Sequence, residues 1–390
     1  MDKATLAGMS MPLQKKTAVY WLVSVLMLLV IYKRLMPLES GDMQSFLYPW
    51  FSAILAGGYA AMAGDYANYS PPYLYLLGLA SLFSPLASPI VLIKSVSIVF
   101  TFAGAAVFGL IVMEVSRNRN LALTSACFFP LIPSVAVNAA WWGQCDVIYT
   151  TFLLAAFWAS IRRAPLQVVI FFGIAFSFKA QAIFFTPYLL YLVLKKELPW
   201  RYLLLIPVIY ACMMLPAWLA GRPAAELASI YVNQGGYYKS LAMNAPNPWA
   251  IIEKYHLMPY AAGVLLGAAA TVAASLFLVR KSLLSKYDEV TVKLWLVTMS
   301  TLASPYLLPK MHDRYFFPAD VFTVLLCVIF PRYRIAAISM QIASVLVALA
   351  FLKTPDARSS LSVVASVFSS IALFWLLFKP PVSMRSEAAR

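Results

Sequence analysis

Acidic side chains stand in short polar stretches between long apolar runs, and one of them occupies an unusual position. The stretch from Glu39 to Tyr75 opens with Gly41 and Asp42, a few residues beyond an apolar run that ends at Met36. A charged carboxylate near hydrocarbon is costly, so an aspartate at that boundary is a candidate functional group, although it can also cap a helix. We therefore take Asp42 as the first candidate for a general base.

Further polar stretches supply carboxylates, amides, aromatic rings and cations, without the motif of a phosphate-binding loop, a dinucleotide site or a zinc hydrolase. This mixture suits a sugar attached to a lipid phosphate. A sugar that leaves on phosphate leaves as a stabilised anion and needs no general acid, whereas the attacking hydroxyl needs a base. One carboxylate is then sufficient, with cations near the phosphate. The candidate substrate-binding residues are Glu39, Tyr69, Trp141, Gln144, Asp146, Lys179, Gln181, Lys310, His312, Asp313 and Arg314.

Three carboxylates compete for the role of base, and several candidates have a plainer alternative. Asp42 ranks first, Asp146 second and Glu39 third. Asp146 directly precedes an apolar run, so it could instead cap the following helix. Asp313 and Arg314 are adjacent and could form no more than a local ion pair. The tryptophans could stack on a sugar or lie in the interfacial belt of a membrane protein.

The composition is that of a polytopic membrane protein. Of the 390 residues, 62% are hydrophobic and 12% are charged, and the mean hydropathy is +0.79, far from the balance of a soluble domain. The net charge of +15 would suggest nucleic acid in a soluble chain, but here Lys and Arg form short clusters between apolar runs, as the positive-inside rule requires. We therefore expect a membrane and no nucleic acid as partner. The scattered cysteines and two histidines indicate neither a disulfide framework nor a metal site.

Twelve apolar runs are candidates for membrane-spanning helices, because a span needs about 20 largely apolar residues and fewer where neighbours shield its ends. The short run from Pro72 to Phe83 is left out, since counting it would place Arg117 and Arg119 opposite the other basic clusters. Most basic clusters then lie on one side, which we expect to be cytoplasmic, while Lys33 and Arg34 break the pattern. The runs are Thr17–Met36, Pro89–Val115, Leu121–Asn138, Val147–Ile161, Pro165–Phe178, Ala180–Leu194, Pro199–Leu219, Pro259–Val279, Val290–Leu308, Pro318–Phe330, Ile335–Leu352 and Leu361–Phe378.

The chain is therefore expected to be a single transmembrane domain over residues 1–390, with its polar motifs on the outer face. The first outer loop covers about 37–88, and the motif loops cover about 139–146, 178–182, 220–258 and 309–317. The run from 165 to 194 must hold two short helices around Lys179, and broken helices are normal only where they line a cavity.

Four motifs in this order resemble those of a known superfamily. They are GD at Gly41 and Asp42, NYSPPYLY at 68–75, WWGQCD at 141–146 and KMHDRYFFP at 310–318. Each motif alone is weak, but the ordered set resembles the GT-C superfamily of membrane glycosyltransferases. Within it, the chain looks most like bacterial relatives of the dolichyl-phosphate-glucose glucosyltransferases and the GPI mannosyltransferases. The resemblance covers about 17–330.

The resemblance implies an all-α GT-C fold and an inverting glycosyltransferase that needs neither cofactor nor metal. Its donor would be a polyprenyl-phosphate hexose, with mannose or glucose as the sugar. Its acceptor would be a lipid-linked or envelope glycan on the outer, periplasmic face of the cell inner membrane. Asp42 matches the family's base, and His312 and Asp313 match a motif that helps to bind the donor. Arg314 stands where eukaryotic relatives have lysine, and residues 68–70 hold no acid where those relatives carry one.

Two other functions stay open. A transporter or flippase for a lipid-linked sugar would also need many spans and outer polar residues, but transport sites usually lie near the bilayer midplane, where Lys94 is the nearest charge. An oligosaccharide ligase or polymerase with a pyrophosphate-linked donor would be expected to carry a larger outer loop or more cations.

Overall fold

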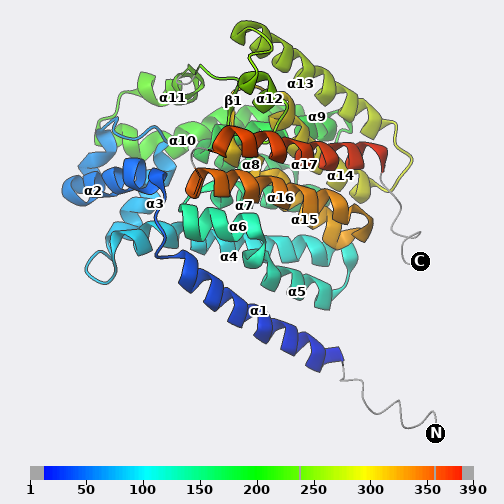
Figure 1. Ribbon diagram of the computed structural model, residues 1–390, viewed down its shortest axis with the longest axis horizontal. Helices are drawn as coiled ribbons and strands as arrows, with labels where there is room; N and C mark the ends of the chain where they lie inside the picture. The colour runs from blue at the N-terminus through cyan, green and yellow to red at the C-terminus, as the bar shows by residue number, and fades with distance from the viewer. Residues whose placement is uncertain (1–12, 237–238, 355–356, 380–390) are drawn as a thin grey trace.

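The computed structural model describes residues 13–236, 239–354 and 357–379, and most of this chain is helical (Figure 1). The predicted all-α class is confirmed, with one very short pair of strands in the described chain. The α-helices are α1 (Leu13–Leu35), α2 (Tyr48–Gly57), α3 (Pro71–Ser81), α4 (Pro89–Ser116), α5 (Arg119–Phe128), α6 (Pro133–Ala136), α7 (Asp146–Ile161), α8 (Pro165–Phe178), α9 (Thr186–Leu194), α10 (Leu205–Ala220), α11 (Ala224–Gly236), α12 (Trp249–Lys254), α13 (Tyr260–Leu283), α14 (Glu289–Leu307), α15 (Phe317–Ile329), α16 (Arg334–Leu352) and α17 (Arg358–Phe378).

Shorter helical segments and the two strands connect these helices. Two segments are π-helical, η1 (Met43–Leu47) and η4 (Val137–Trp142). The 3₁₀ segments are η2 (Gly58–Ala63), η3 (Phe129–Leu131), η5 (Ala180–Phe185), η6 (Trp200–Leu204), η7 (Asp313–Phe316) and η8 (Pro331–Tyr333). The strands β1 (Ala242–Met243) and β2 (Met311–His312) pair in parallel and so join the long loop after α11 to the KMHDRYFFP motif.

Proline and capping residues fix many of the helix starts. Pro71, Pro89 and Pro165 each begin a helix, where a missing N–H costs nothing. Asn118 and Asp288 each accept a hydrogen bond from the backbone N–H three residues on, at 3.0 and 2.9 Å, and so cap α5 and α14. Each of the twelve predicted apolar runs forms a helix or a series of helical segments, including the expected break between α8 and η5 at Lys179.

Length and composition mark six helices of the described chain as able to cross a membrane, or seven if the bent pair Arg119–Leu131 and Pro133–Trp142 is one span. Five of the six coincide with predicted runs. The sixth, Met43–Ala63, lies within the predicted first outer loop. That loop therefore contains an apolar helix of spanning length, which the twelve runs did not include, and its sequence continues into α3.

Apolar side chains cover the outside of several helices. Leu265 of α13 is 73% exposed and Val30 of α1 is 62% exposed, whereas every residue of α14 from Thr291 to Tyr306 is buried. Rows of large exposed apolar side chains are unfavourable in water. Hydrocarbon covers such rows without cost, so the surface fits a protein embedded in a membrane.

The buried α14 lies among α13, α15 and α17, and α16 packs against both α15 and α17 (Figure 1). On the other side of the molecule α4 packs against α5 and α7, and α7 packs against α8. In Figure 1 the start of α1 and the end of α17 lie toward the right, and α2, α3 and α11 lie at the left. The inserted helices α2, α3 and α11 are thus gathered at one end of the molecule.

Gly267 provides a test of the packing between α13 and the end of α14. A Cβ atom added at Gly267 would come within 2.9 Å of the Leu307 carbonyl oxygen and 2.8 Å of Trp249 Cζ2. We expect Gly267→Ala to lower the free energy of unfolding by about 1–3 kcal/mol because backbone must move, although alanine favours a helix more than glycine does. The unfolding midpoint in detergent measures this. Gly78→Ala is the control, since its Cβ would meet nothing closer than 3.5 Å; equal midpoints for both variants would contradict the expectation.

Candidate functional site

Asp42 is held in one orientation by groups from distant parts of the chain. Its Oδ2 atom accepts hydrogen bonds from Trp142 Nε1 and Gln144 Nε2, both at 2.9 Å, and lies 3.5 Å from Arg314 Nη1. Its Oδ1 atom accepts no hydrogen bond from the residues that the structure describes, and 14% of the side chain is exposed. Asp42 precedes η1 without making a capping hydrogen bond, so the helix-cap alternative is wrong.

Lys94 fixes the backbone that leads to Asp42. It is fully buried in α4, and its Nζ atom donates to the carbonyl oxygens of Leu35, Met36 and Leu38, at 3.4, 2.9 and 2.5 Å. These carbonyls belong to the end of α1 and the turn after it, where helical carbonyls lack partners and a cation is favoured. Lys94 therefore links the end of α1 to α4 and fixes the position of the backbone just before Asp42.

The WWGQCD segment is fixed by two serines and a glycine. Ser40 Oγ donates to the Trp142 carbonyl oxygen at 3.0 Å, and Ser97 Oγ donates to the Gln144 carbonyl oxygen at 2.6 Å. Gly143 has a φ of 76°, a conformation that glycine adopts without strain. This turn ends the π-helix η4 and lets Trp142 and Gln144 present their side chains to the same carboxylate.

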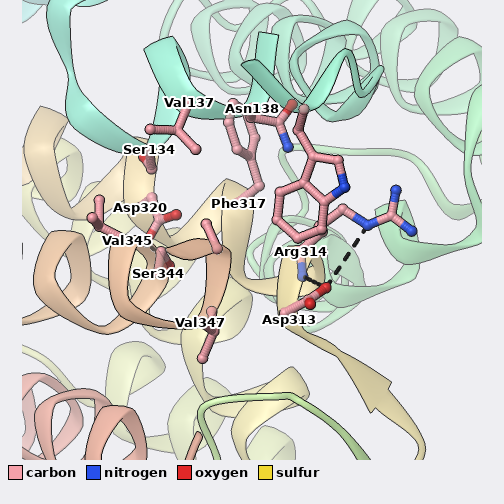
Figure 2. A pocket seen from close by; sticks show the side chains of 12 residues that line it. Ser134, Val137, Asn138, Asp313, Arg314, Phe317, Asp320, Ser344, Val345 and Val347 are labelled. Carbon is pink, nitrogen blue, oxygen red and sulfur yellow. Dashed lines mark hydrogen bonds and ion pairs between the residues drawn. The ribbon is translucent and has the colours of Figure 1, made fainter. Parts of the chain in front are cut away.

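Arg314 closes the cluster around Asp42. Its guanidinium lies over the Trp142 ring, 5.3 Å from Cζ to the centroid, and 15% of the side chain is exposed. Its Nε lies 3.8 Å from Asp313 Oδ1, and its backbone N–H donates to the same oxygen at 2.9 Å (Figure 2). The expected local pair of Asp313 and Arg314 is thus present, and Arg314 also reaches Asp42. Burial raises the pKa of Asp313 to about 7, against the opposing effect of Arg314.

Asp146 and Lys179 form a second, buried pair. The Lys179 ammonium contacts Asp146 Oδ1, and Asn138 Nδ2 donates to Asp146 Oδ2 at 2.9 Å. Asp146 has no exposed surface, so it is poorly placed to serve as a base toward a substrate. The residue at the cap position of α7 is Cys145, and the Asp146 side chain makes no capping hydrogen bond in the described chain. The capping alternative is therefore wrong as well, and Asp146 serves to hold Lys179 at the helix break.

Glu39 and Lys310 make their polar contacts outside the Asp42 cluster. Glu39 is exposed and accepts hydrogen bonds from Tyr48 and Gln44, which lower the pKa of Glu39. The Lys310 ammonium donates to the carbonyl oxygen of a residue in α11, Gly235.

His312 is partly buried in the short strand β2. Burial and the neighbouring Arg314 lower the pKa of His312 to about 3, so its ring is neutral near pH 7. The ring lies 5.1 Å from that of Tyr315, and the His312 backbone pairs with β1. Gln181 makes no hydrogen bond to Asp42 or Arg314 in the described chain, and its Oε1 is buried without a partner there.

Three tryptophans of the predicted outer loops lie inside the protein rather than in a lipid-facing belt. Trp50, Trp141 and Trp142 are 4%, 9% and 3% exposed, so the belt alternative is wrong for these three. Trp142, which was not among the predicted site residues, donates to Asp42. The Tyr69 hydroxyl donates to Gln144 Oε1 at 3.3 Å and so lies beside the same cluster.

A cavity of about 20 Å³ adjoins the cluster (Figure 2). Asp313 and Arg314 lie at one end of it, and Asp320 and Ser344 lie at the other. This volume is enough for about one water molecule.

Some residues that build the site were not predicted. Asn138 holds Asp146, and Ser40 and Ser97 hold the WWGQCD backbone. All three are polar residues in or beside apolar runs. That pattern indicates a specific hydrogen-bond partner, but it does not show which residue is the partner. Lys94 was noted only as a charge near the midplane.

Comparison with known proteins leaves the function to be argued from this geometry. No protein-family model matches the chain, and no curated protein matches its sequence. Among the residues that the structure describes, no three His, Cys, Asp or Glu side chains form a group that could hold a metal ion.

Lys94→Met tests how Asp42 is positioned. The change removes the donor from three carbonyls at the end of α1, which costs about 1–3 kcal/mol when such groups stay buried. We expect faster hydrogen–deuterium exchange in residues 36–44 of the purified protein. Lys33→Met is the control, because Lys33 is exposed in the last turn of α1. The same exchange rates in both variants would show that Lys94 does not hold this segment.

Asp313→Asn tests the raised pKa of Asp313. Because the folded-state pKa, about 7, exceeds the ordinary value of 3.8, the folded protein keeps a proton that the unfolded chain loses. This group's contribution to stability therefore falls as pH rises from about 4 to about 7 and is level above that. Asp313→Asn should gain stability relative to wild type over this window, by about 4 kcal/mol at most. Unfolding midpoints of both proteins at pH 5 and pH 8 measure this, and a constant difference would contradict the raised pKa.

Proposed function

We propose that this chain is an inverting membrane glycosyltransferase of the GT-C type. It moves a hexose, mannose or glucose, from a polyprenyl-phosphate carrier to a lipid-linked or envelope glycan acceptor. A twelve-span arrangement, with the site on the periplasmic face of the inner membrane, belongs to the same proposal. The observation that carries it is the Asp42 carboxylate, whose Oδ2 is fixed by two side-chain donors while Oδ1 has no hydrogen-bond donor in the described chain.

A carboxylate with one fixed oxygen and one oxygen open to substrate can act as a general base. Asp42 Oδ1 takes the proton from the acceptor hydroxyl as that oxygen bonds to the anomeric carbon of the donor sugar. The bond from that carbon to the phosphate oxygen breaks, and the phosphate leaves with the electron pair. The phosphate is stable as an anion, so no acid has to protonate it. Attack opposite to the leaving phosphate inverts the anomeric centre.

The surroundings of Asp42 support binding of a sugar phosphate. Arg314 Nη1 is 3.5 Å from the carboxylate and so places a cation beside the proposed base. Tyr69 and Trp142 place aromatic rings and a hydroxyl beside it, as sugar sites commonly require. Specificity for one hexose would depend on these neighbours.

Lys94 does not provide evidence for the alternative function, transport of a lipid-linked sugar. A transport site near the midplane needs a polar or charged group that a substrate or ion can reach. Lys94 is buried, and its ammonium is occupied by three backbone carbonyls. Its contacts explain its presence without a transported ligand.

Asp42→Asn tests the proposed base. Asparagine keeps the size of the side chain but cannot accept the proton, so we expect the turnover rate to fall about 100- to 10,000-fold while the KM for donor changes little. The purified protein in lipid is offered a panel of polyprenyl-phosphate hexoses with extracted envelope glycolipids, and donor consumption is followed.

Glu39→Gln is the matched control for that experiment. Glu39 is three residues away and exposed, and its carboxylate faces Tyr48 and Gln44 instead of the cluster. This variant should keep close to the wild-type rate. An Asp42→Asn protein that retains most of its activity would remove Asp42 from the role of base.

A further inference from the structure

A column of aromatic rings leads from the carboxylate cluster to the turn between α16 and α17. Trp142 stacks on Phe351, with ring centroids 4.8 Å apart and planes inclined by 22°. The Arg358 guanidinium lies over the Phe351 ring at 4.5 Å, and the Lys353 ammonium lies over the neighbouring Trp141 ring at 5.4 Å. Two cations from a turn outside every sequence motif are therefore joined to the site through Trp141 and Trp142.

Both cations retain hydrogen-bond donors. Lys353 is exposed and Arg358 is half-buried, and neither forms an ion pair with a carboxylate in the described chain. Arg358 Nη2 donates to the Phe351 carbonyl oxygen at 3.1 Å, near the end of α16. Its Nε is buried and has no partner among the described residues. Aromatic faces hold the two charges in place without neutralising them.

The cluster around Asp42 does not itself have enough positive charge for a phosphate. Arg314 already faces two carboxyl groups, Asp42 at 3.5 Å and Asp313 at 3.8 Å. Lys179 is paired with the buried Asp146. An incoming phosphate would add a further negative charge to this group, so it needs cations from elsewhere.

We propose that Lys353 and Arg358 bind the phosphate group of a lipid carrier beside Trp141 and Trp142. The inference rests on the proposed function in one respect, namely that the carrier is the polyprenyl phosphate of the sugar donor. Lys353 lies over Trp141, the sequence neighbour of the Trp142 that donates to Asp42, and Arg358 is linked to Trp142 through the ring of Phe351. The turn between α16 and α17 thus supplies the positive charge that Arg314 alone lacks.

The same two cations could instead meet the phosphate of an ordinary membrane phospholipid, since cations at helix ends often reach the headgroup level. The chemistry is shared, because both ligands present a phosphate on a lipid. The two sources differ in the lipid chain and are separated by binding each of them to the same variants.

The test measures binding of three probes to the full-length protein in detergent by isothermal calorimetry. The probes are a polyprenyl monophosphate, the polyprenol of the same length and a dioleoyl phosphatidic acid. Charged hydrogen bonds to phosphate are each worth about tenfold or more in affinity. We expect Lys353→Ala and Arg358→Ala each to weaken polyprenyl-monophosphate binding by about tenfold or more and to leave polyprenol binding unchanged.

Lys254→Ala is the matched control. Lys254 also lies over an aromatic ring, that of Tyr255 at 5.6 Å, and contacts the same α16–α17 region through a 2.9 Å hydrogen bond to Ser360 Oγ. It has no contact with Trp141 or Trp142, so its loss should not change phosphate binding. Arg358→Lys keeps a cation and covers the case in which Arg358→Ala fails to fold. Lys353→Ala removes the contact with the Trp141 ring but no side-chain hydrogen bond or ion pair among the described residues.

Each outcome decides the inference. Loss of affinity for the monophosphate alone supports the phosphate site. Unchanged affinity, or an equal loss for polyprenol, overturns it. Phosphatidic acid that binds as tightly as the polyprenyl monophosphate, with the same dependence on Lys353, overturns the assignment to the donor.

The phosphate site and the proposed function fail in distinguishable ways. Binding of polyprenyl monophosphate through Arg358 by a protein that transfers no sugar would refute the transferase and keep the phosphate site. Sugar transfer with an unchanged donor KM in both Lys353→Ala and Arg358→Ala would keep the transferase and refute the site.

Discussion

One carboxylate oxygen accepts hydrogen bonds from a tryptophan and a glutamine that follow it by 100 and 102 residues in the chain. These two bonds require the stretch after α1 and the turn after η4 to meet at one point, and Arg314 of η7 reaches the same oxygen at 3.5 Å. Lys94 supports this arrangement by holding the end of α1 against α4. Ser40 and Ser97 support it by hydrogen bonding to the backbone of the WWGQCD segment. The helices around them are arranged so that Asp42 has one occupied oxygen and one open oxygen.

The two ion groups near the site differ in how their charges are balanced. Asp146 and Lys179 neutralise each other at the helix break, deep in the protein. An unpaired charge there would be expensive, and this pair leaves none. The Asp42, Asp313 and Arg314 group is different, because one cation faces two carboxyl groups. That imbalance marks this part of the molecule as a place where protonation or a bound ligand changes the electrostatics.

The sequence was sufficient to locate the helices and several members of the site, because apolar runs, proline starts and polar motifs are local signals. Asp42, Gln144 and Arg314 were identified in this way and do meet. Trp141 was predicted to bind substrate and Trp142 was not, yet Trp142 donates to Asp42, and both rings are buried. No local pattern distinguishes these two neighbouring tryptophans.

Other parts of the site depend on tertiary contacts that no single stretch contains. Lys310 and His312 belong to the KMHDRYFFP motif. In the structure, however, the backbone of His312 in β2 pairs with β1, and the Lys310 ammonium donates to the Gly235 carbonyl oxygen. The helix Met43–Ala63 was read as a loop because a polar opening and a glycine pair interrupt its apolar character. The aromatic column through Phe351 joins residues more than 200 positions apart, which only the packed structure brings together.

The measurement that tests the account most directly is the anomeric configuration of a product made by the wild-type protein. Purified protein in lipid is given one polyprenyl-phosphate hexose of known configuration and an extracted glycolipid acceptor, and the new linkage is read by nuclear magnetic resonance. The account predicts transfer with inverted configuration, as direct attack by a hydroxyl activated at Asp42 requires. Retained configuration, or movement of the intact lipid-linked sugar across the membrane with no new linkage, would contradict it.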